Sequence, residues 1–137
     1  MAIDHECYVD TSAFIALRDR SDHFHPLFRG LFENPPILTT SALVVAEAYG
    51  WFLRRYGSIR ALEILDLVKR LPALNVVPFG PAEFPAVTAM ATKFHDQRVA
   101  LADAHGLAIM SDRRIRTCWS TDRHLGLTGV PLVITVQ

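Results

Sequence analysis

Short apolar segments alternate with longer segments of helical pattern along the whole chain of 137 residues. Strands that alternate with helices are typical of α/β proteins, because a pair of parallel strands needs a long crossover connection, usually a helix. The chain is therefore predicted to be an α/β sandwich around a mostly parallel sheet. The apolar segments predict five short strands, at 7–9, 37–39, 75–79, 117–120 and 132–136.

Six helices are predicted between these strands, from apolar residues that recur at helical spacing. The third helix begins at a cap formed by Thr40 or Ser41. The fourth carries an apolar stripe at every third residue, which starts with Ile59 and Leu62. The predicted ranges are 13–18, 22–33, 41–56, 58–71, 82–95 and 101–110.

The composition is that of one ordinary globular domain spanning residues 1–137. Half of the chain is apolar and 20% is charged, which suffices for a normal core. No stretch reaches the roughly 18 uninterrupted apolar residues of a membrane helix. The start, Met-Ala-Ile-Asp-His-Glu, lacks the basic residues and apolar run of a signal peptide. We therefore expect a soluble, cytoplasmic protein with no membrane contact. Zero formal net charge argues against a general nucleic-acid coat protein.

Four carboxylates interrupt or end apolar runs: Asp10, Glu47, Asp103 and Asp122. An ionised carboxylate in apolar surroundings is unfavourable unless its charge is compensated. Two of these acids follow predicted strands, and the other two lie near the starts of predicted helices. In a parallel sheet, the carboxyl ends of the strands and the helix starts that follow them share one edge. The four acids are therefore predicted to converge in one pocket, with a divalent metal as the compensating charge.

Such a pocket predicts hydrolytic chemistry on a phosphodiester. Carboxylate oxygens are the ligands that Mg²⁺ and Mn²⁺ prefer. Two ions among three or four carboxylates can activate a water and stabilise the leaving oxygen. An RNA substrate is compatible with zero net charge, because arginines around the segment of Asp122 could contact phosphates. A solvated helix end and loop is the alternative for these arginines. They are Arg113, Arg114, Arg116 and Arg123.

Each acid also has a purely structural interpretation. Asp10 could cap the helix that follows it, Asp103 could favour a helix start through the helix dipole, and Asp122 could begin a turn. Glu47 is the hardest to explain in this way, because its helix neighbours one turn away carry no positive charge. His124 is close enough to Asp122 in sequence to assist RNA binding or an acid-bound water.

Each of the four acids lies in a short motif: Tyr-Val-Asp-Thr-Ser-Ala at 8–13, Thr-Thr-Ser-Ala-Leu-Val-Val-Ala-Glu at 39–47, Leu-Ala-Asp-Ala at 101–104 and Trp-Ser-Thr-Asp-Arg-His-Leu at 119–125. These motifs resemble those of the PIN-domain nucleases and, within that family, of the small VapC-type toxins of toxin–antitoxin pairs. The resemblance spans nearly the whole chain, and its most specific feature is the order Asp, Glu, Asp, Asp of the four acids.

The resemblance implies a three-layer α/β/α fold around a central sheet of about five mainly parallel strands. It also implies a Mg²⁺- or Mn²⁺-dependent endoribonuclease that forms a homodimer. Such toxins are silenced by a cognate antitoxin that covers or enters the pocket. Carried over by motif, Asp10 and Asp103 are the main metal ligands. Glu47 binds metal directly or through water and helps to activate the nucleophile, and Asp122 completes the pocket. Two small hydroxyl residues are expected to orient these acids: Ser12 and Ser120.

Two places depart from the family pattern. Leu125 stands three residues after the fourth acid, where an aromatic residue is common, and His105 and Gly106 stand where small or aliphatic residues are usual. Because no acid is lost, these departures bear on local packing and substrate fit more than on catalysis. From its position in the helix, His105 is expected at the edge of the core.

Two other functions stay open. A PIN-like module that binds RNA or protein without cutting it would keep the same fold. A phosphatase of the haloacid dehalogenase type would also begin with a strand and an Asp-Thr-Ser turn. That class needs a second aspartate two residues after Asp10, where this chain has Ser12. The intact acids favour the nuclease.

Overall fold

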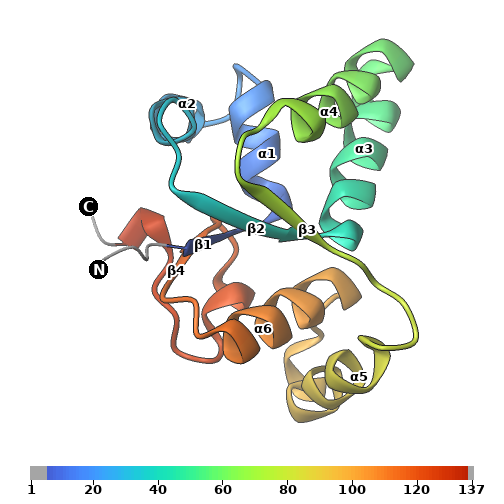
Figure 1. The fold of residues 1–137 in the computed structure, drawn as a ribbon. Helices are drawn as coiled ribbons and strands as arrows, with labels where there is room; N and C mark the ends of the chain where they lie inside the picture. Colours follow the sequence, from blue (N-terminus) through green and yellow to red (C-terminus); the bar gives the residue numbers. More distant parts are fainter. Residues whose placement is uncertain (1–5, 136–137) are drawn as a thin grey trace.

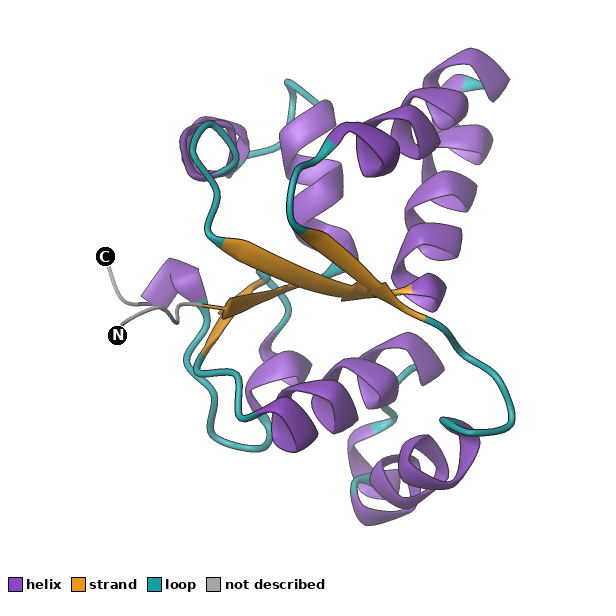
Figure 2. Ribbon diagram, in the orientation of Figure 1, coloured by secondary structure: helices purple, strands orange, loops and turns teal. Residues whose placement is uncertain are grey.

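The computed structural model describes residues 6–135 and shows a parallel sheet between two layers of helices (Figure 1, Figure 2). Within these residues the sheet has four strands in the order β3-β2-β1-β4, and every neighbouring pair is parallel. The predicted α/β/α sandwich is therefore confirmed. The strands are β1 (Glu6–Val9), β2 (Ile37–Ser41), β3 (Leu74–Val77) and β4 (Thr117–Trp119).

Helices α1 to α4 cover one face of the sheet, and α5 and α6 cover the other (Figure 1). The predicted helices are confirmed, with their ends moved by one turn or less. None of the helices within residues 6–135 is long and apolar enough to cross a membrane. The helices are α1 (Thr11–Arg18), α2 (His25–Leu31), α3 (Ala42–Tyr56), α4 (Ser58–Arg70), α5 (Phe84–Lys93) and α6 (Leu101–Arg113), and short 3₁₀ turns are η2 (His95–Gln97), η3 (Arg123–Gly126) and η4 (Val133–Thr135).

The fifth strand, predicted over 132–136, is wrong within the described residues. Leu132 pairs with Cys118 in a single parallel bridge, and the next three residues form η4. The backbone N–H of Thr135 donates to the carbonyl of Leu132 over 3.0 Å, and its hydroxyl donates to the same oxygen over 2.8 Å. These bonds curl the chain, so the ladder beside β4 does not continue. Val136, the last residue of the predicted strand, lies outside the described residues.

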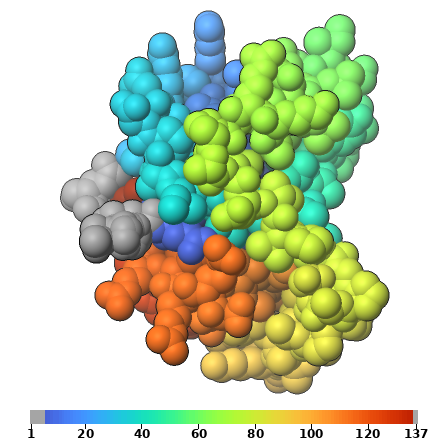
Figure 3. All heavy atoms as spheres, viewed as in Figure 1, coloured from blue at the N-terminus to red at the C-terminus, as the bar shows by residue number. Residues whose placement is uncertain are grey.

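The apolar stripe of α4 was predicted to face the core, and this prediction is wrong for the first two residues of the stripe. Ile59 and Leu62 are 77% and 53% exposed, whereas Ala61 and Ile64 are buried. A stripe with a spacing of three drifts around a helix of 3.6 residues per turn, so its first members point outward. Figure 3 shows α4, in yellow-green, on the outer surface of its layer.

Helix α6 lies against β1 without room for a side chain at Gly106. A Cβ atom there would lie 2.9 Å from atoms of both Tyr8 and Leu125, closer than packed carbon atoms approach. Glycine therefore lets the helix approach the strand, and Leu125 fills the adjacent space. The two departures from the family pattern at these positions form one packing contact, which holds the first turns of α6 beside β1.

The histidine expected at the edge of the core, His105, is buried, with 1% of its surface exposed. Its Nδ1 lies 2.6 Å from the hydroxyl oxygen of Ser41, and its ring packs against Phe79. Burial lowers the pKa of this imidazole, although the charge of Glu83 acts in the opposite direction. His105 therefore belongs to the packing between α6 and the sheet.

Candidate active site

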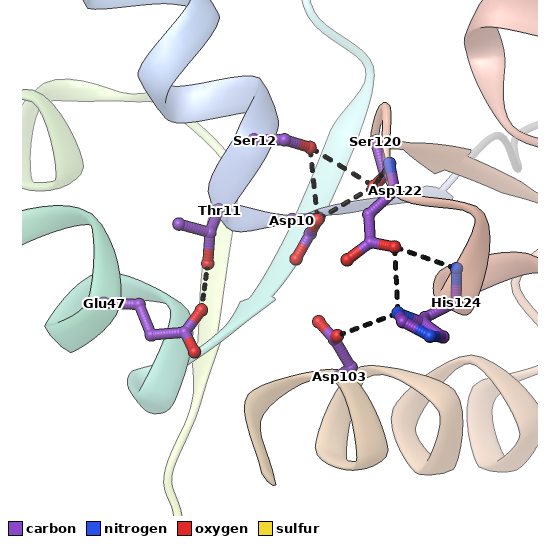
Figure 4. Close-up of polar contacts among 8 residues, drawn as sticks. All are labelled: Asp10, Thr11, Ser12, Glu47, Asp103, Ser120, Asp122 and His124. Atoms are coloured by element: carbon purple, nitrogen blue, oxygen red, sulfur yellow. Dashed lines mark hydrogen bonds and ion pairs between the residues drawn. The ribbon is translucent and has the colours of Figure 1, made fainter. Parts of the chain in front are cut away.

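Residues from four elements meet at the carboxyl edge of the sheet (Figure 4). Asp10 follows β1 and precedes α1, and Asp122 follows β4. Asp103 lies in the first turn of α6, on the other side of the sheet. Glu47, from the second turn of α3, lies beside Thr11 at the same edge. The structure thus brings together the four acids that the sequence predicted, as the parallel topology requires.

Asp10 is almost completely buried, with 3% of its surface exposed. Its Oδ2 accepts hydrogen bonds from the hydroxyls of Ser120 over 2.8 Å and Ser12 over 3.2 Å. Its other carboxylate oxygen is directed toward Asp103 (Figure 4). Burial raises the pKa of this carboxyl against the hydrogen bonds that it accepts, and the charge of Asp122 adds to the rise. One oxygen is therefore fixed by the protein and the other faces the cluster.

The two predicted supporting serines join the segments that carry Asp10 and Asp122. Their Oγ atoms lie 3.2 Å apart. Ser120 Oγ accepts the backbone N–H of Asp122 over 2.9 Å, and Ser12 Oγ accepts that of Thr121 over 3.0 Å. Each hydroxyl contacts both the Asp10 carboxylate and the loop after β4. The serines therefore set the relative position of the two acids.

Asp103 is 7% exposed, and the pKa of its carboxyl is raised from 3.8 to about 8. Burial is the largest cause, followed by the negative charges of Asp10, Asp122 and Glu47. Across residues 6–135, none of these four acids forms an ion pair with a lysine or an arginine. No lysine or arginine of the described chain compensates the negative charge of the cluster, so a proton or an added cation must do so.

His124 joins the cluster through an Asx turn at the start of η3. Oδ1 of Asp122 accepts the backbone N–H of His124 over 3.0 Å. Nδ1 of the same histidine lies 3.1 Å from this oxygen and 4.0 Å from Oδ2 of Asp103. The sequence analysis gave this residue only an assisting role. The signal for its closer involvement is an aspartate two residues earlier, in a turn that directs both side chains to one side.

Glu47 is the most exposed of the four acids. Its Oε1 accepts a hydrogen bond from the hydroxyl of Thr11 over 2.7 Å. Thr11 directly follows Asp10, so the start of α1 orients acids on both sides of it. Sequence analysis missed Thr11, whose only signal was a hydroxyl next to the first acid.

Three of the four arginines that could contact phosphates lie at the opposite edge of the sheet. Arg113 contacts Oε2 of Glu6 over 2.7 Å. Glu6 begins β1 whereas Asp10 follows its end, so the arginine is a whole strand away from the cluster. Arg114 and Arg116 lie between the end of α6 and the start of β4, at that same edge. These three arginines therefore belong to a solvated helix end and loop, the alternative interpretation. Only Arg123, which directly follows Asp122, lies near the acids.

The donor set of the cluster fits a divalent cation. Ligand atoms of Asp103, Asp122 and His124 all lie within 4.8 Å of one another. Asp10 directs a carboxylate oxygen toward the same place (Figure 4). Carboxylate oxygens suit Mg²⁺ and Mn²⁺, and an imidazole nitrogen suits first-row transition ions. A cation would also supply the positive charge that no lysine or arginine of the described chain provides.

Known proteins resemble this chain in both sequence and fold. A family model described as PIN domain matches residues 7–129. Ribonuclease VapC26 of Mycobacterium tuberculosis is 29% identical over 116 residues, which cover 84% of this chain and 85% of the relative. The solved structure of VapC20 from the same organism, described as a sarcin–ricin loop cleaving toxin, superposes with a TM-score of 0.80 at 22% identity, covering 91% of this chain and 96% of that chain. A toxin–antitoxin complex from Klebsiella pneumoniae gives a TM-score of 0.62 at 18% identity, covering 93% and 95% of the two chains.

Proposed function

Because the chain belongs to the PIN-domain family, we propose that it is an endoribonuclease that hydrolyses RNA with Mg²⁺ or Mn²⁺ held by its acidic cluster. The observation that carries the proposal is the convergence of buried carboxylates without a lysine or arginine of the described chain beside them. Such an arrangement is unfavourable for folding, and perturbed carboxyl groups of this kind concentrate at functional sites. A relative named as a ribonuclease supports RNA as the substrate.

The acids would have different roles in phosphodiester hydrolysis. Asp10 and Asp103 would hold the cation directly, and Asp122 would complete its surroundings. The cation supplies positive charge to the phosphate and lowers the pKa of a bound water. Ser12 and Ser120 hold Asp10 in place, so little rearrangement is needed when substrate binds.

Glu47 would accept the proton of the attacking water. Thr11 holds its Oε1, which leaves Oε2 without that restraint. The side chain is exposed at the edge of the cluster, where a substrate and its water arrive. A positioned carboxylate of this kind acts as a general base when the water lies within hydrogen-bond reach.

The protein would act as the toxin of a toxin–antitoxin pair. Relatives named VapC26 and VapC20, and a fold shared with a toxin–antitoxin complex, support this role. A cognate antitoxin would cover or enter the pocket, and an arginine of that partner would supply the missing counter-charge. The active form would be a cytoplasmic homodimer, for which exposed apolar residues such as Ile59 and Leu62 offer contact surface.

The direct test is RNA cleavage by the wild type and Asp10→Asn, with Mg²⁺, Mn²⁺ or EDTA. Asp112→Asn is the matched control, because Asp112 is an exposed residue of α6 outside the cluster. We expect cleavage by the wild type and the control with either cation, and no cleavage by Asp10→Asn or in EDTA. Cleavage that persists in EDTA or in Asp10→Asn would contradict the metal-dependent mechanism. RNA binding without cleavage would favour a binding module.

A growth test addresses the toxin role separately. Expression of the wild type alone should arrest growth, and Asp10→Asn should relieve the arrest. Co-expression with a short reading frame found directly upstream should restore growth and so identify the antitoxin. Unchanged growth with a protein that cuts RNA in vitro would contradict the toxin role and leave the nuclease activity in place.

A further inference from the structure

Within residues 6–135, His124 is the one member of the metal-ligand group that is not an acid. We propose that its Nδ1 atom is a ligand of the same divalent cation as Asp103 and Asp122, and that this nitrogen makes the site select Mn²⁺ over Mg²⁺. The inference rests on the cation-dependent function proposed above, to which it adds a residue and a metal preference.

The distances of the His124 Nδ1 atom from the two carboxylates fit one shared ion. Two ligands of a single cation are separated by at most about twice the ion–ligand bond, roughly 4.2 Å for bonds near 2.1 Å. Nδ1 lies 3.1 Å from Oδ1 of Asp122 and 4.0 Å from Oδ2 of Asp103, so both separations fall within this limit. Because Asp103 belongs to α6, the ring of His124 faces a point between two elements of the fold.

The turn that contains His124 does not require an imidazole. Its backbone N–H donates to Asp122 over 3.0 Å, and any residue except proline could donate this bond. The side chain is 27% exposed, yet it directs Nδ1 toward the acids and not toward solvent (Figure 4). Nδ1 lies 3.1 Å from Oδ1 of Asp122 and also faces Asp103. A cation shared with the two carboxylates would be bound by all three groups in this arrangement.

A nitrogen ligand changes which cation binds best. Mg²⁺ prefers oxygen ligands and retains its waters, whereas the affinity of sites with imidazole rises through the first transition series from Mn²⁺ onward. With Nδ1 on the ion, the proton of the neutral ring lies on Nε2, which can donate to solvent or to a phosphate oxygen. The site should therefore bind Mn²⁺ more tightly than Mg²⁺, and the difference should depend on His124.

Pulsed electron paramagnetic resonance of protein-bound Mn²⁺ tests the ligand directly, because a coordinated ¹⁴N gives a hyperfine coupling that oxygen ligands lack. We expect this coupling in the wild type and in His95→Gln, whose exposed histidine lies outside the cluster. His124→Gln should lose it. Titration calorimetry should also show the Mn²⁺-to-Mg²⁺ affinity ratio of His124→Gln falling about tenfold, the scale on which single supporting residues act in metal sites.

Mn²⁺ that binds the wild type without a ¹⁴N coupling would overturn the assignment, and this measurement does not depend on how any variant folds. An unchanged affinity ratio in folded His124→Gln would overturn the metal preference. RNA cleavage is scored separately. Nitrogen-coupled Mn²⁺ in a protein that cuts no RNA would support the His124 ligand and contradict the nuclease. RNA cleavage by a protein whose bound Mn²⁺ shows no ¹⁴N coupling would support the nuclease and contradict the His124 ligand.

Discussion

Two aspartates with similarly small exposed surfaces have pKa values that depart from the ordinary carboxyl value in opposite directions. Asp19, after the end of α1, is 8% exposed, and Asp103, at the start of α6, is 7% exposed. Burial acts to raise the pKa at both positions. At Asp19, hydrogen bonds from Ser21 and Tyr56 and the charge of Arg55 outweigh burial and lower the pKa. At Asp103 the neighbours are other acids, which add to burial and raise the pKa to about 8.

The difference distinguishes a paired structural acid from an acid of the candidate site. Near Asp19 the charges are paired, since Glu63 contacts Arg18 at 2.9 Å and Arg60 at 3.2 Å. A broad groove lies among these residues, but its acids already have partners. The acids at the carboxyl edge of the sheet have no lysine or arginine partner within residues 6–135, and only His124 contacts two of them. Buried charge without a partner, more than the size of a hollow, therefore marks the candidate site.

The largest effect on stability is expected from Asp19→Ala, which removes a carboxylate that accepts three hydrogen bonds. Oδ1 accepts the backbone N–H and the hydroxyl of Ser21 over 3.0 and 2.7 Å, and Oδ2 accepts the hydroxyl of Tyr56 over 3.2 Å. Loss of this acceptor should lower the free energy of unfolding by about 3 kcal/mol. Urea denaturation measures the loss, while RNA cleavage by the folded variant should match the wild type.

The exposed residue Asp112 supplies the control for this substitution. Asp112→Ala should change the free energy of unfolding by less than about 0.5 kcal/mol, as surface substitutions do. A similarly small loss in Asp19→Ala would show that pairing contributes little at that end, and the contrast with Asp103 would fail.

Asp103→Asn should have the opposite effect in the cation-free protein. The unfolded chain releases the proton of Asp103 near its ordinary pKa of 3.8, whereas the folded protein keeps it up to about 8. Wild-type stability should therefore fall as pH rises between these values, because the folded state binds more protons there. Asparagine cannot ionise, so the variant should be more stable than the wild type by roughly 1–3 kcal/mol above the folded-state pKa, where the burial of unpaired charge is avoided.

Urea denaturation in EDTA across this pH range measures the difference between the wild type and Asp103→Asn. The difference should shrink as pH falls toward 3.8, where the carboxyl is protonated in both states. A difference that does not vary with pH would mean that the charge of Asp103 is compensated in the folded protein after all.

A smaller effect is expected when a cation is added to the wild type at about pH 9, where the carboxyl of Asp103 is ionised. Mn²⁺ at ten times its Kd should raise the free energy of unfolding by about 1.4 kcal/mol, since it binds only the folded state. Asp103→Asn lacks one charged ligand and should gain less than half as much. Thermal unfolding with and without Mn²⁺ checks this. Equal gains in the two proteins would place the ion outside the cluster.

The sheet and the helices could be predicted because alternating apolar runs and helical periodicity are local signals. The fold departs from the prediction where contacts between distant parts of the chain determine the local structure or the buried face of a helix. Leu132 starts a strand in sequence, but its carbonyl is taken by Thr135 and the chain curls. The stripe of α4 keeps a spacing of three, and only the packing of Ala61 and Ile64 reveals which face is buried.

In the candidate site, too, some positions could be predicted from local sequence signals and others depended on tertiary contacts. Asp10 and Asp122 could be placed because strand ends of a parallel sheet share an edge. The contacts of His124 with Asp103 and of Thr11 with Glu47 join different elements. No sequence spacing encodes them, and they required the structure.

The smallest change in stability is expected from Thr11→Val, which removes the hydrogen bond to Glu47 at the carboxyl edge of the sheet. Valine removes the hydroxyl and keeps the branched shape of the side chain. The lost bond is exposed, so the free energy of unfolding should change by less than about 0.5 kcal/mol, as it should in the exposed control Thr88→Val. The single-turnover rate of RNA cleavage should nevertheless fall about tenfold, because Glu47 loses its fixed orientation. Combining Thr11→Val with Glu47→Gln should then slow cleavage no further than Glu47→Gln alone. Additive losses of rate would show that Thr11 affects the reaction independently of Glu47. The hydrogen bond between them would then not explain how Glu47 is oriented.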